Sequence, residues 1–348
     1  MGFGEPFGCL EQEQWHEWVS FLFAHLKAAA LLASISFYPT LKNLLFRLLP
    51  KSAFEQARKH HDMSADKVNR RLARGAEDRK DVLSFLLNVK DGVMTAGEME
   101  GTAATLILAG SEGTSALLTA VTNFLVRHPE KLAKLEHEIR TEFASEDEIT
   151  LTRLEHLPYI EAVLREGMRV APPVPTSIPR IVPPGDDIVN GVRLPGGTFI
   201  GLHQFSAYRH SSNFALADHF IPERWLPTDS PLFKPSPSDP PFSSTTFAND
   251  DVAVLQPFSV GPRSCAGTTL ARHELRLVIG RLVWNFDLAV PGEAHKDAMR
   301  PHSMMPGNFK WEEQKTFSLW ERQPCQVQFG FASADGKPRT GSSVVIKC

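Results

Sequence analysis

One cysteine lies in a segment whose residue types could bind a metal. Cys265 stands within the sequence FSVGPRSCAG at positions 258–267, directly before a segment with helical periodicity. A thiolate is a soft ligand that suits iron, and a helix N-terminus lowers the pKa of a nearby thiol. The segment therefore indicates that Cys265 is a deprotonated metal ligand. A buried structural cysteine in a glycine-containing turn is the alternative interpretation.

The neighbours of Cys265 fit a flat, negatively charged macrocycle such as haem. Gly261 and Gly267 have no side chains and would let the backbone approach a planar ring closely. Arg263, two residues before the cysteine, could pair with a haem propionate. The remaining cysteines form no C-x-x-C pair, which argues against a zinc site or a disulfide framework; they are Cys9, Cys325 and Cys348.

Two further segments carry charged residues that could form an ion-pair network. Glu166 and Arg169 are three residues apart, which places both side chains on one face of a helix. Arg224 lies in the sequence PERW at 222–225. A lone E-x-x-R pair is usually a solvated helix pair, so the order of the segments along the chain matters more than either one.

Taken together, these segments resemble those of cytochromes P450. Residues 258–267 match F-x-x-G-x-R-x-C-x-G at every fixed position, beginning with Phe258, and Glu166 precedes the cysteine by 99 residues (265 − 166). The resemblance implies heme b (iron protoporphyrin IX) with the Cys265 thiolate as axial ligand. It also implies that Glu166, Arg169 and Arg224 are a structural triad, which locks the surroundings of the cysteine loop.

Two other sites follow from the same resemblance. Arg180 stands where many members place a second propionate ligand, and an exposed loop arginine is the equal alternative. Residues 109–114, AGSEGT, resemble the [AG]-G-x-[DE]-T-[TS] motif that crosses the oxygen side of the haem. Ala109 and Gly110 would leave room for dioxygen, and Glu112 would be the acid of the proton relay.

The chain departs from that motif at its fifth position. Gly113 replaces the family's key threonine, and Thr114 is the less critical neighbour. In a regular helix Thr114 would point about 100° away from position 113. The departure leaves open a haem-thiolate isomerase or dehydratase, which needs no threonine relay. A buried glycine-containing helix with an incidental glutamate is the non-functional interpretation of the segment.

Hydrophobic periodicity predicts the elements that position these residues. Thr95 and Glu98 form a capping box, which predicts a long, central, buried helix from 95 to 127. Further predicted elements are helices at 129–143 and 158–170, a hairpin at 188–194, a strand at 198–202 and a surface loop at 227–251. After Gly267 a helix is expected to bury a stripe made of Ala271, Leu275, Val278 and Leu282.

Composition is that of a folded protein. Of the 348 residues, 42% are hydrophobic and 22% charged, which is enough for a sizeable core. The net charge of −3 gives no reason to expect nucleic acid as a partner. We predict one mainly α domain with a small β region over 1–331, followed by a tail at 332–348. The resemblance implies a cytochrome P450 fold that begins near the E helix and lacks the N-terminal helices.

The resemblance also sets expectations about activity and location. The turn at 2–10 and the segment at 15–50 look like parts of filamentous-fungal members of secondary metabolism. They imply a monooxygenase that oxidises a small apolar molecule with dioxygen and electrons from NADPH-cytochrome P450 reductase. A non-functional truncated fragment is the third hypothesis.

The family's location would be the cytoplasmic face of the endoplasmic reticulum membrane, although this chain lacks a clear N-terminal anchor. Residues 19–38 are long enough to span a bilayer but contain His25 and Lys27. Peripheral contact with the membrane surface is therefore preferred over a true span.

Overall fold

A computed structural model describes residues 30, 32–35, 37, 38, 44, 51–74, 94–290, 310–323, 325–332 and 344–347. The chain divides into two compact units, Met1–Glu112 and Gly113–Cys348, and the boundary falls inside helix α6 (Ala96–Arg127). Each unit is treated by itself. The single domain predicted over 1–331 stays a prediction, and the turn predicted at 2–10 lies outside the described residues.

The first unit contains α4 (Lys51–Ala73) and the beginning of α6. The predicted capping box is present: the Thr95 N–H donates to Glu98 Oε2 at 2.7 Å, and the Glu98 N–H donates to Thr95 Oγ1 at 3.3 Å. Val68 of α4 and Ala103 of α6 form a small buried cluster. The burial expected along the whole of α6 is only partly correct, because Leu106 is exposed whereas Leu117 is buried.

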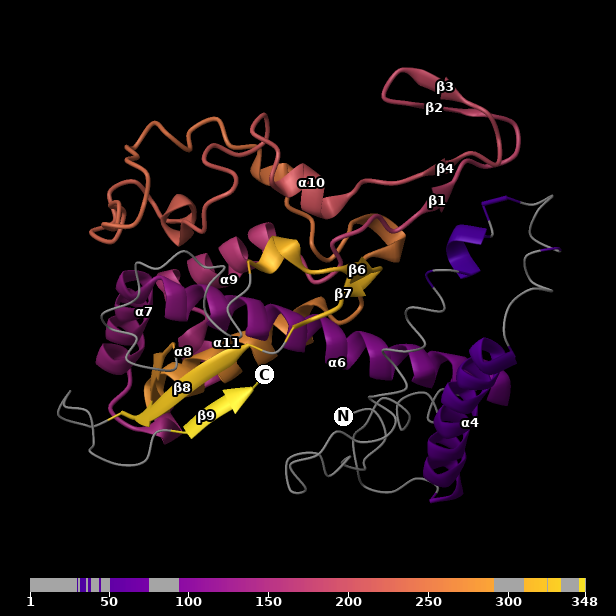
Figure 1. The fold of residues 1–348 in the computed structure, drawn as a ribbon, viewed down its shortest axis with the longest axis horizontal. Coiled ribbons are helices and arrows are strands. Elements are labelled where there is room, and N and C mark those ends of the chain that lie inside the picture. Colours follow the sequence, from indigo (N-terminus) through magenta and orange to yellow (C-terminus); the bar gives the residue numbers. More distant parts are fainter. Residues whose placement is uncertain are drawn as a thin grey trace. The chain divides into compact units, whose positions relative to one another are not determined.

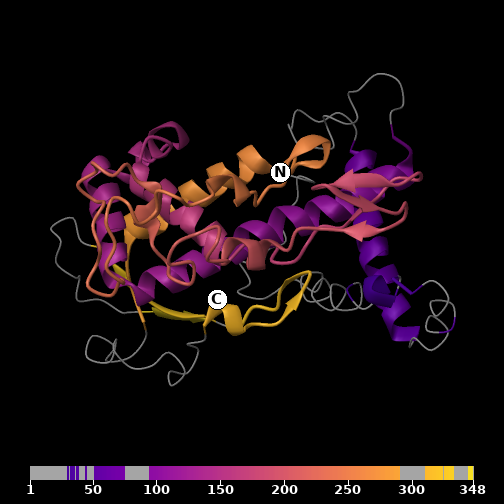
Figure 2. The ribbon, with the colours of Figure 1, turned by 90° about the horizontal axis from the view of Figure 1, so that it is seen from above.

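The core of the second unit is built by the C-terminal half of α6 with α7 (Pro129–Glu142), α9 (Pro158–Val170) and α11 (Thr268–Asn285). Helix α9 approaches α6 closely at Gly167, where an added Cβ would stand 2.5 Å from Val121 Cγ2. Figure 2 shows α11 on one side of the C-terminal half of α6, with β8 and the hairpin β6–β7 on the other.

Short elements complete this unit (Figure 1). The helical ones are α8 (Leu151–Leu154), α10 (Gln204–Tyr208), and the 3-10 turns η1 (Glu146–Glu148), η2 (Pro222–Trp225), η3 (Val252–Val254), η4 (Gly261–Arg263) and η6 (Trp311–Glu313). The described strands all pair antiparallel: β1 (Arg180–Ile181) with β4 (Phe199–Ile200), β2 (Asp187–Val189) with β3 (Val192–Leu194), β6 (Thr316–Phe317) with β7 (Leu319–Trp320), and β8 (Gln326–Phe331) between β5 (Phe286–Ala289) and β9 (Val344–Lys347).

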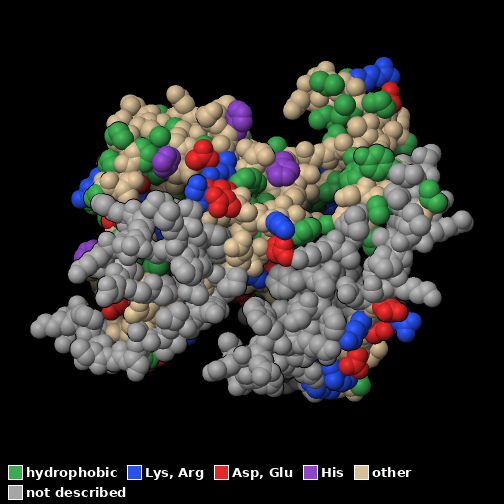
Figure 3. Space-filling view, in the orientation of Figure 1, with side chains coloured by type: hydrophobic (Ala, Val, Ile, Leu, Met, Phe, Trp, Pro, Cys, Tyr) green, Lys and Arg blue, Asp and Glu red, His purple; other side chains and the backbone are tan. Residues whose placement is uncertain are grey.

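The predicted hairpin turns at Asn190 and Gly191, which both have positive φ, of 49° and 77°. Two consecutive residues in the left-handed region suit the tight turn that joins two strands. The arm made by β1–β4 and β2–β3 exposes apolar side chains, among them Ile188 and Val192 (Figure 3). Strand β9 lies in the tail, where the sequence predicted no element, and it adds an edge strand to the sheet.

The buried face of α11 differs from the predicted stripe. Val278 is 45% exposed, and the fully or nearly buried side chains are Leu275, Ile279 and Val283. These three are spaced by four residues and face a core that α7, α8 and α9 supply. Gly280 lies on the same face, where an added Cβ would stand 3.0 Å from Leu154 Cδ2. The prediction was correct for Leu275 and not for Val278, because apolar residues lie on more than one side of this helix.

Candidate functional site

Cys265 lies in a tight loop that ends at the N-terminus of α11. Its N–H donates to the Phe258 carbonyl at 2.8 Å, so the ends of the loop are joined. Gly261 has a φ of 75°, a conformation that residues with side chains rarely adopt. The Thr268 hydroxyl donates to the Cys265 carbonyl at 2.7 Å at the start of the helix. The loop therefore presents an exposed, free thiol.

The residues of this loop fit a haem. Within the described ranges no group of three or more His, Cys, Asp or Glu side chains could hold a metal ion. A lone thiolate suits an iron whose other ligands come largely from a porphyrin. Arg263, in the turn η4, is exposed and available to a carboxylate.

Glu166, Arg169 and Arg224 meet in a buried ion-pair network: the spacing predicted the first two to share a helix face, and the resemblance implied the third. Arg169 donates to Glu166 through Nε at 2.9 Å and through Nη2 at 2.8 Å. Arg224 Nε donates to Glu166 Oε1 at 3.2 Å. The Glu166 and Arg169 side chains are completely buried, and that of Arg224 nearly so. The network joins α9 to η2.

The charge of Glu166 is held by its neighbours. Burial by itself would raise the pKa of this carboxyl group, and the positive charges of Arg169 and Arg224 act in the opposite direction. Hydrogen bonds from Arg169 and from the Ile221 N–H add to the lowering, and the pKa falls to about 2. Glu166 is therefore ionised at neutral pH, so its contacts with Arg169 and Arg224 join opposite charges.

The turn η2 carries contacts on two sides. Arg224 and Trp225 point to Glu166, which accepts the Trp225 Nε1–H at 2.9 Å. Glu223, between Pro222 and Arg224, faces the other way: it accepts from Lys134 Nζ at 2.5 Å and from the Tyr159 hydroxyl at 3.0 Å. One short turn thus ties α9 to α7. The sequence indicated the Arg224 half of this arrangement and not the Glu223 half.

The motif at 109–114 lies within an unbroken α-helix. Glu112 is buried and belongs to the first unit, and Thr114 is half-buried and belongs to the second. Ala109 is exposed, and a Cβ added at Gly110 or Gly113 would meet nothing within 4 Å beyond the helix's own backbone. The roles predicted for these residues stay predictions.

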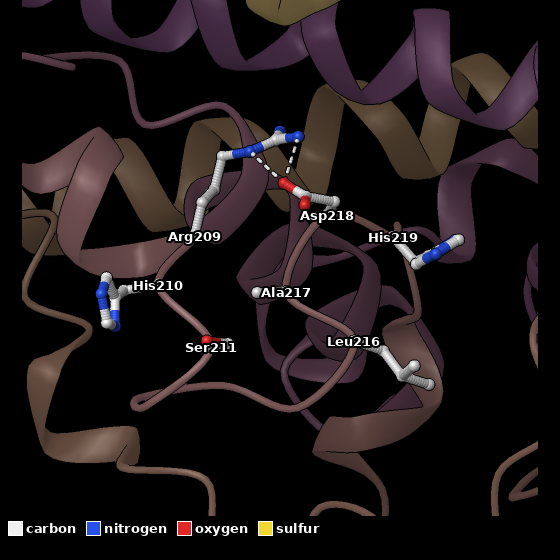
Figure 4. A pocket seen from close by; sticks show the side chains of 7 residues that line it. All are labelled: Arg209, His210, Ser211, Leu216, Ala217, Asp218 and His219. Atoms are coloured by element: carbon white, nitrogen blue, oxygen red, sulfur yellow. Dashed lines mark hydrogen bonds and ion pairs between the residues drawn. The ribbon is translucent and has the colours of Figure 1, made fainter.

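Arg180 is exposed in β1, where its Nη1 donates to the carbonyls of Pro179 at 3.1 Å and Ile178 at 3.4 Å. These bonds lie within its own segment, so its propionate role also stays a prediction. A surface pocket lies elsewhere and is lined by Arg209, His210, Ser211, Leu216, Ala217, Asp218 and His219 (Figure 4).

Two of the residues that line this pocket also contact the ion-pair network. The carbonyls of Ala217 and His219 accept hydrogen bonds from Arg169 at 2.6 and 2.8 Å. Within the pocket lining, Arg209 Nη2 pairs with Asp218 Oδ1 at 3.0 Å. Figure 4 shows the side chains of His210 and His219 turned away from each other. The pocket residues therefore support Arg169 and do not converge on a ligand.

Sequence reasoning missed one carboxylate of the site. Asp250 Oδ2 accepts from Arg224 Nη1 at 2.7 Å. It is separated from Glu166 by 84 positions (250 − 166) and lies in the aperiodic segment that was expected to be a surface loop. No local spacing could have found it, because a loop residue has no fixed geometric relation to a helix.

Comparisons with known proteins place these features in one family. A family model described as cytochrome P450 matches residues 1–312. The chain is 36% identical, over 94% of its length, to cytochrome P450 monooxygenase lcsI of Purpureocillium lilacinum and covers 58% of that protein. It is 36% identical, over 99% of its length, to cytochrome P450 monooxygenase astA of Talaromyces wortmannii and covers 62% of it.

A third relative is similar to this chain in sequence, and a solved structure is similar to it in fold. Averantin hydroxylase of Dothistroma septosporum is 36% identical over 94% of this chain, which covers 58% of that protein. The chain thus spans 58–62% of the length of these curated relatives. The crystal structure of the cytochrome P450DA heme domain matches 100% of this chain and 64% of its own with a TM-score of 0.68 and 19% identity, a likeness of fold.

Proposed function

The chain belongs to the cytochrome P450 family, and from this premise we propose that it is a haem-thiolate monooxygenase that oxidises a small apolar molecule of secondary metabolism. The observation that carries the proposal is the exposed thiol of Cys265 in a closed loop at the N-terminus of α11. The names of the fungal relatives, monooxygenases and a hydroxylase among them, support the reaction class.

Each residue of the site has a proposed task. Cys265 binds the iron, and Arg263 and Arg180 neutralise the haem propionates. When bound, the haem supplies the iron chemistry that activates dioxygen. By the family resemblance, Ala109 and Gly110 of α6 would leave space for dioxygen, Glu112 would be the acid of the proton relay, and Thr114 would offer a hydroxyl group.

The partners belong to the proposal as well. Electrons would come from NADPH through NADPH-cytochrome P450 reductase, the substrate would be a small apolar molecule, and the protein would contact the cytoplasmic face of the endoplasmic reticulum membrane. Family membership supports a reductase and a small substrate. The identity of the fungal relatives supports secondary metabolism.

The test of this proposal is a reduced carbon-monoxide difference spectrum of the expressed protein. We expect a thiolate-type Soret band that Cys265→Ala abolishes. Cys325→Ala should keep the band, because Cys325 is buried and bonded to Asn123, and Cys9→Ala should keep it too. Equal loss in all three variants would overturn the ligand assignment. Absence of haem in the wild-type chain would favour a non-functional fragment.

Gly113 supports a second candidate function. A haem-thiolate isomerase or dehydratase acts on an already oxygenated substrate and needs neither the threonine relay nor external electrons. Incubation with a hydroperoxide substrate without NADPH separates the two. Rearrangement of the hydroperoxide would favour the isomerase, whereas NADPH-dependent insertion of one oxygen atom in the presence of reductase would favour the monooxygenase.

A further inference from the structure

We propose that Asp250 is a positioning residue of the cysteine loop, because it is the fourth charged member of the buried network of Glu166, Arg169 and Arg224. This inference rests on the proposed haem site at Cys265. It names a residue outside the motif segments, and it makes the network a pair of arginines balanced by a pair of carboxylates.

Asp250 is bonded through both of its oxygens. Oδ2 accepts from Arg224 Nη1 at 2.7 Å, and Oδ1 accepts the Ala215 N–H at 2.7 Å. Its side chain is only 5% exposed. A carboxylate that is buried and that accepts from a charged donor on one side and a backbone donor on the other is fixed in place.

The charges of the network require a second carboxylate. Glu166 carries one negative charge and contacts both Arg169 and Arg224, which carry two positive charges and are almost completely buried. A buried charge without a counter-charge is strongly unfavourable. Asp250 brings the sum of the four to zero, so its removal leaves an excess positive charge in the interior.

Hydrogen bonds also hold the segment that runs from Asp250 to the cysteine loop. The next residue, Asp251, donates its N–H to the Asn213 carbonyl at 2.8 Å and caps η3 by accepting from the Ala253 N–H at 3.1 Å. The Gln256 N–H then donates to the Tyr208 hydroxyl at 2.9 Å.

Two residues later, the Phe258 carbonyl accepts the Cys265 N–H at 2.8 Å. The segment from 250 to 258 is therefore held at its beginning by Asp250 and at its end by the cysteine loop. A displacement at Asp250 would reach the backbone acceptor of Cys265.

The experiment compares the full chain with Asp250→Asn and Asp250→Glu, and uses Asp251→Asn as the control. Asp250→Asn keeps the size of the side chain and removes its charge. Asp251 is adjacent and exposed, and an asparagine can still cap η3. Hydrogen exchange is read on the peptide that covers 252–267 and, as internal reference, on the peptide from β8, which holds no member of the network.

We expect Asp250→Asn to speed exchange in 252–267 at least tenfold relative to β8. Asp251→Asn should change it less than twofold, and Asp250→Glu should restore most of the protection. An equal rise in both peptides would mean that Asp250 supports global stability only, and would overturn the positioning role. So would equal effects of the two asparagine variants. This measurement needs no bound haem, so its failure is separate from failure of the proposed function.

The haem-loaded protein gives a second readout. With carbon monoxide bound to the reduced protein, Asp250→Asn should lower the ratio of the thiolate-type to the thiol-type Soret band by about tenfold at equal haem content. The glutamate variant should recover it. An unchanged ratio in Asp250→Asn would contradict the inference even if exchange were faster.

Discussion

At the scale of single residues, Glu166 shows how a fully buried carboxylate remains ionised. It accepts from Arg169, Arg224, Trp225 and the Ile221 N–H. Burial raises its pKa, but the charges of Arg169 and Arg224 and the hydrogen bonds together lower it further, so the net effect favours the ionised form. Its contribution to stability is therefore a property of charge and should depend on pH.

We expect Glu166→Gln to reduce the free energy of unfolding by about 3–5 kcal/mol at pH 7, because it leaves two buried arginines short of a counter-charge. The folded-state pKa of about 2 is below the ordinary value of 4.5. The stabilisation by Glu166 is thus complete above pH 4.5 and is lost as pH falls towards 2. Urea unfolding between pH 7 and pH 3 should show the gap between wild type and variant closing in acid.

Glu148→Gln is the matched control for this measurement. Glu148 also pairs with an arginine, Arg153 at 2.8 Å, but on the surface. Solvent screens such an exposed pair, so the control should differ little from wild type. A constant gap for Glu166→Gln across the whole pH range would contradict the charge argument and leave only a packing role.

Gly113 is the position at which the proposed proton relay lacks the hydroxyl group of a threonine. A Cβ at this position meets no atom within 4 Å beyond the helix's own backbone, so threonine should fit. Acid–base help from one group is worth about 10²–10⁴-fold in rate. We therefore expect Gly113→Thr to raise product formed per NADPH and to lower hydrogen peroxide release.

Gly113→Val separates the hydroxyl group from the shape of the side chain, because valine has the same branched form without the hydroxyl. It should leave the yield of product per NADPH near the wild-type value. If both variants improve that yield equally, the hydroxyl has no role. If neither does, and a hydroperoxide is rearranged without NADPH, the isomerase hypothesis gains.

The residues that sequence could identify are those fixed by local geometry. Glu166 and Arg169 share a helix turn, and the ten residues at 258–267 form one loop. Asp250 could not be predicted, since its contact with Arg224 is set by the path of an aperiodic segment. The same holds for Glu223, whose lysine partner comes from α7.

At the scale of elements, the packing of α9 on α6 depends on a missing side chain. Gly167 lies where an added Cβ would be 2.5 Å from Val121 Cγ2 and 3.3 Å from Leu117 Cδ1. Valine is branched and stiff, and Val121 is completely buried, so it has little freedom to move aside. The helix that carries Glu166 is therefore placed by this close contact.

We expect Gly167→Ala to lower the free energy of unfolding by about 1–3 kcal/mol through overpacking, despite the better helix propensity of alanine. Urea unfolding of the single and double variants with Val121→Ala should show a coupling, because the second change removes the clashing methyl group. Gly113→Ala is the control, where the Cβ is unobstructed and the same substitution should stabilise by up to about 1 kcal/mol. Strictly additive effects would contradict the contact.

The sequence predicted the ends of helices more accurately than it predicted which side of a helix is buried, because strong local signals mark the ends. The predicted helix at 158–170 is found with the same bounds, since proline begins it and two prolines follow its end. On α11 the predicted stripe was only partly correct, because Leu275 is buried whereas Val278 is apolar yet exposed. Which apolar residues face the core depends on neighbouring helices that the helix's own sequence does not reveal.

At the scale of the whole molecule, the family could be inferred from the sequence because its motifs are short and ordered. The division into two compact units inside α6 could not, since the helix is continuous in pattern and in structure. The chain spans 58–62% of the length of these curated relatives, so the activity and the partners of the whole protein are proposals. Membrane association remains a proposal at this scale.

Among the described residues one helix, at 97–127, is long and apolar enough to cross a membrane, judged by length and composition alone. Its second half packs in the core through Leu117, Val121 and Leu125, and Asn123 donates to Cys325 Sγ at 3.3 Å. The second half of this helix is therefore part of the protein core. We therefore expect contact with the membrane to be peripheral, through the segment at 19–38, most of which lies outside the described residues.

Alkaline carbonate extraction of microsomes is the test, and we expect the chain to be released into the supernatant. Of the described residues in that segment, Phe37 and Tyr38 are exposed. Burying an exposed aromatic side chain in the interface favours binding by about 1.5–3 kcal/mol. The double change Phe37→Ser and Tyr38→Ser should therefore weaken binding to microsomes at neutral pH by tenfold or more. Leu151→Ser, which alters an exposed apolar residue on α8, should not. Retention of the wild type in the carbonate pellet would show a true span and overturn the peripheral interpretation.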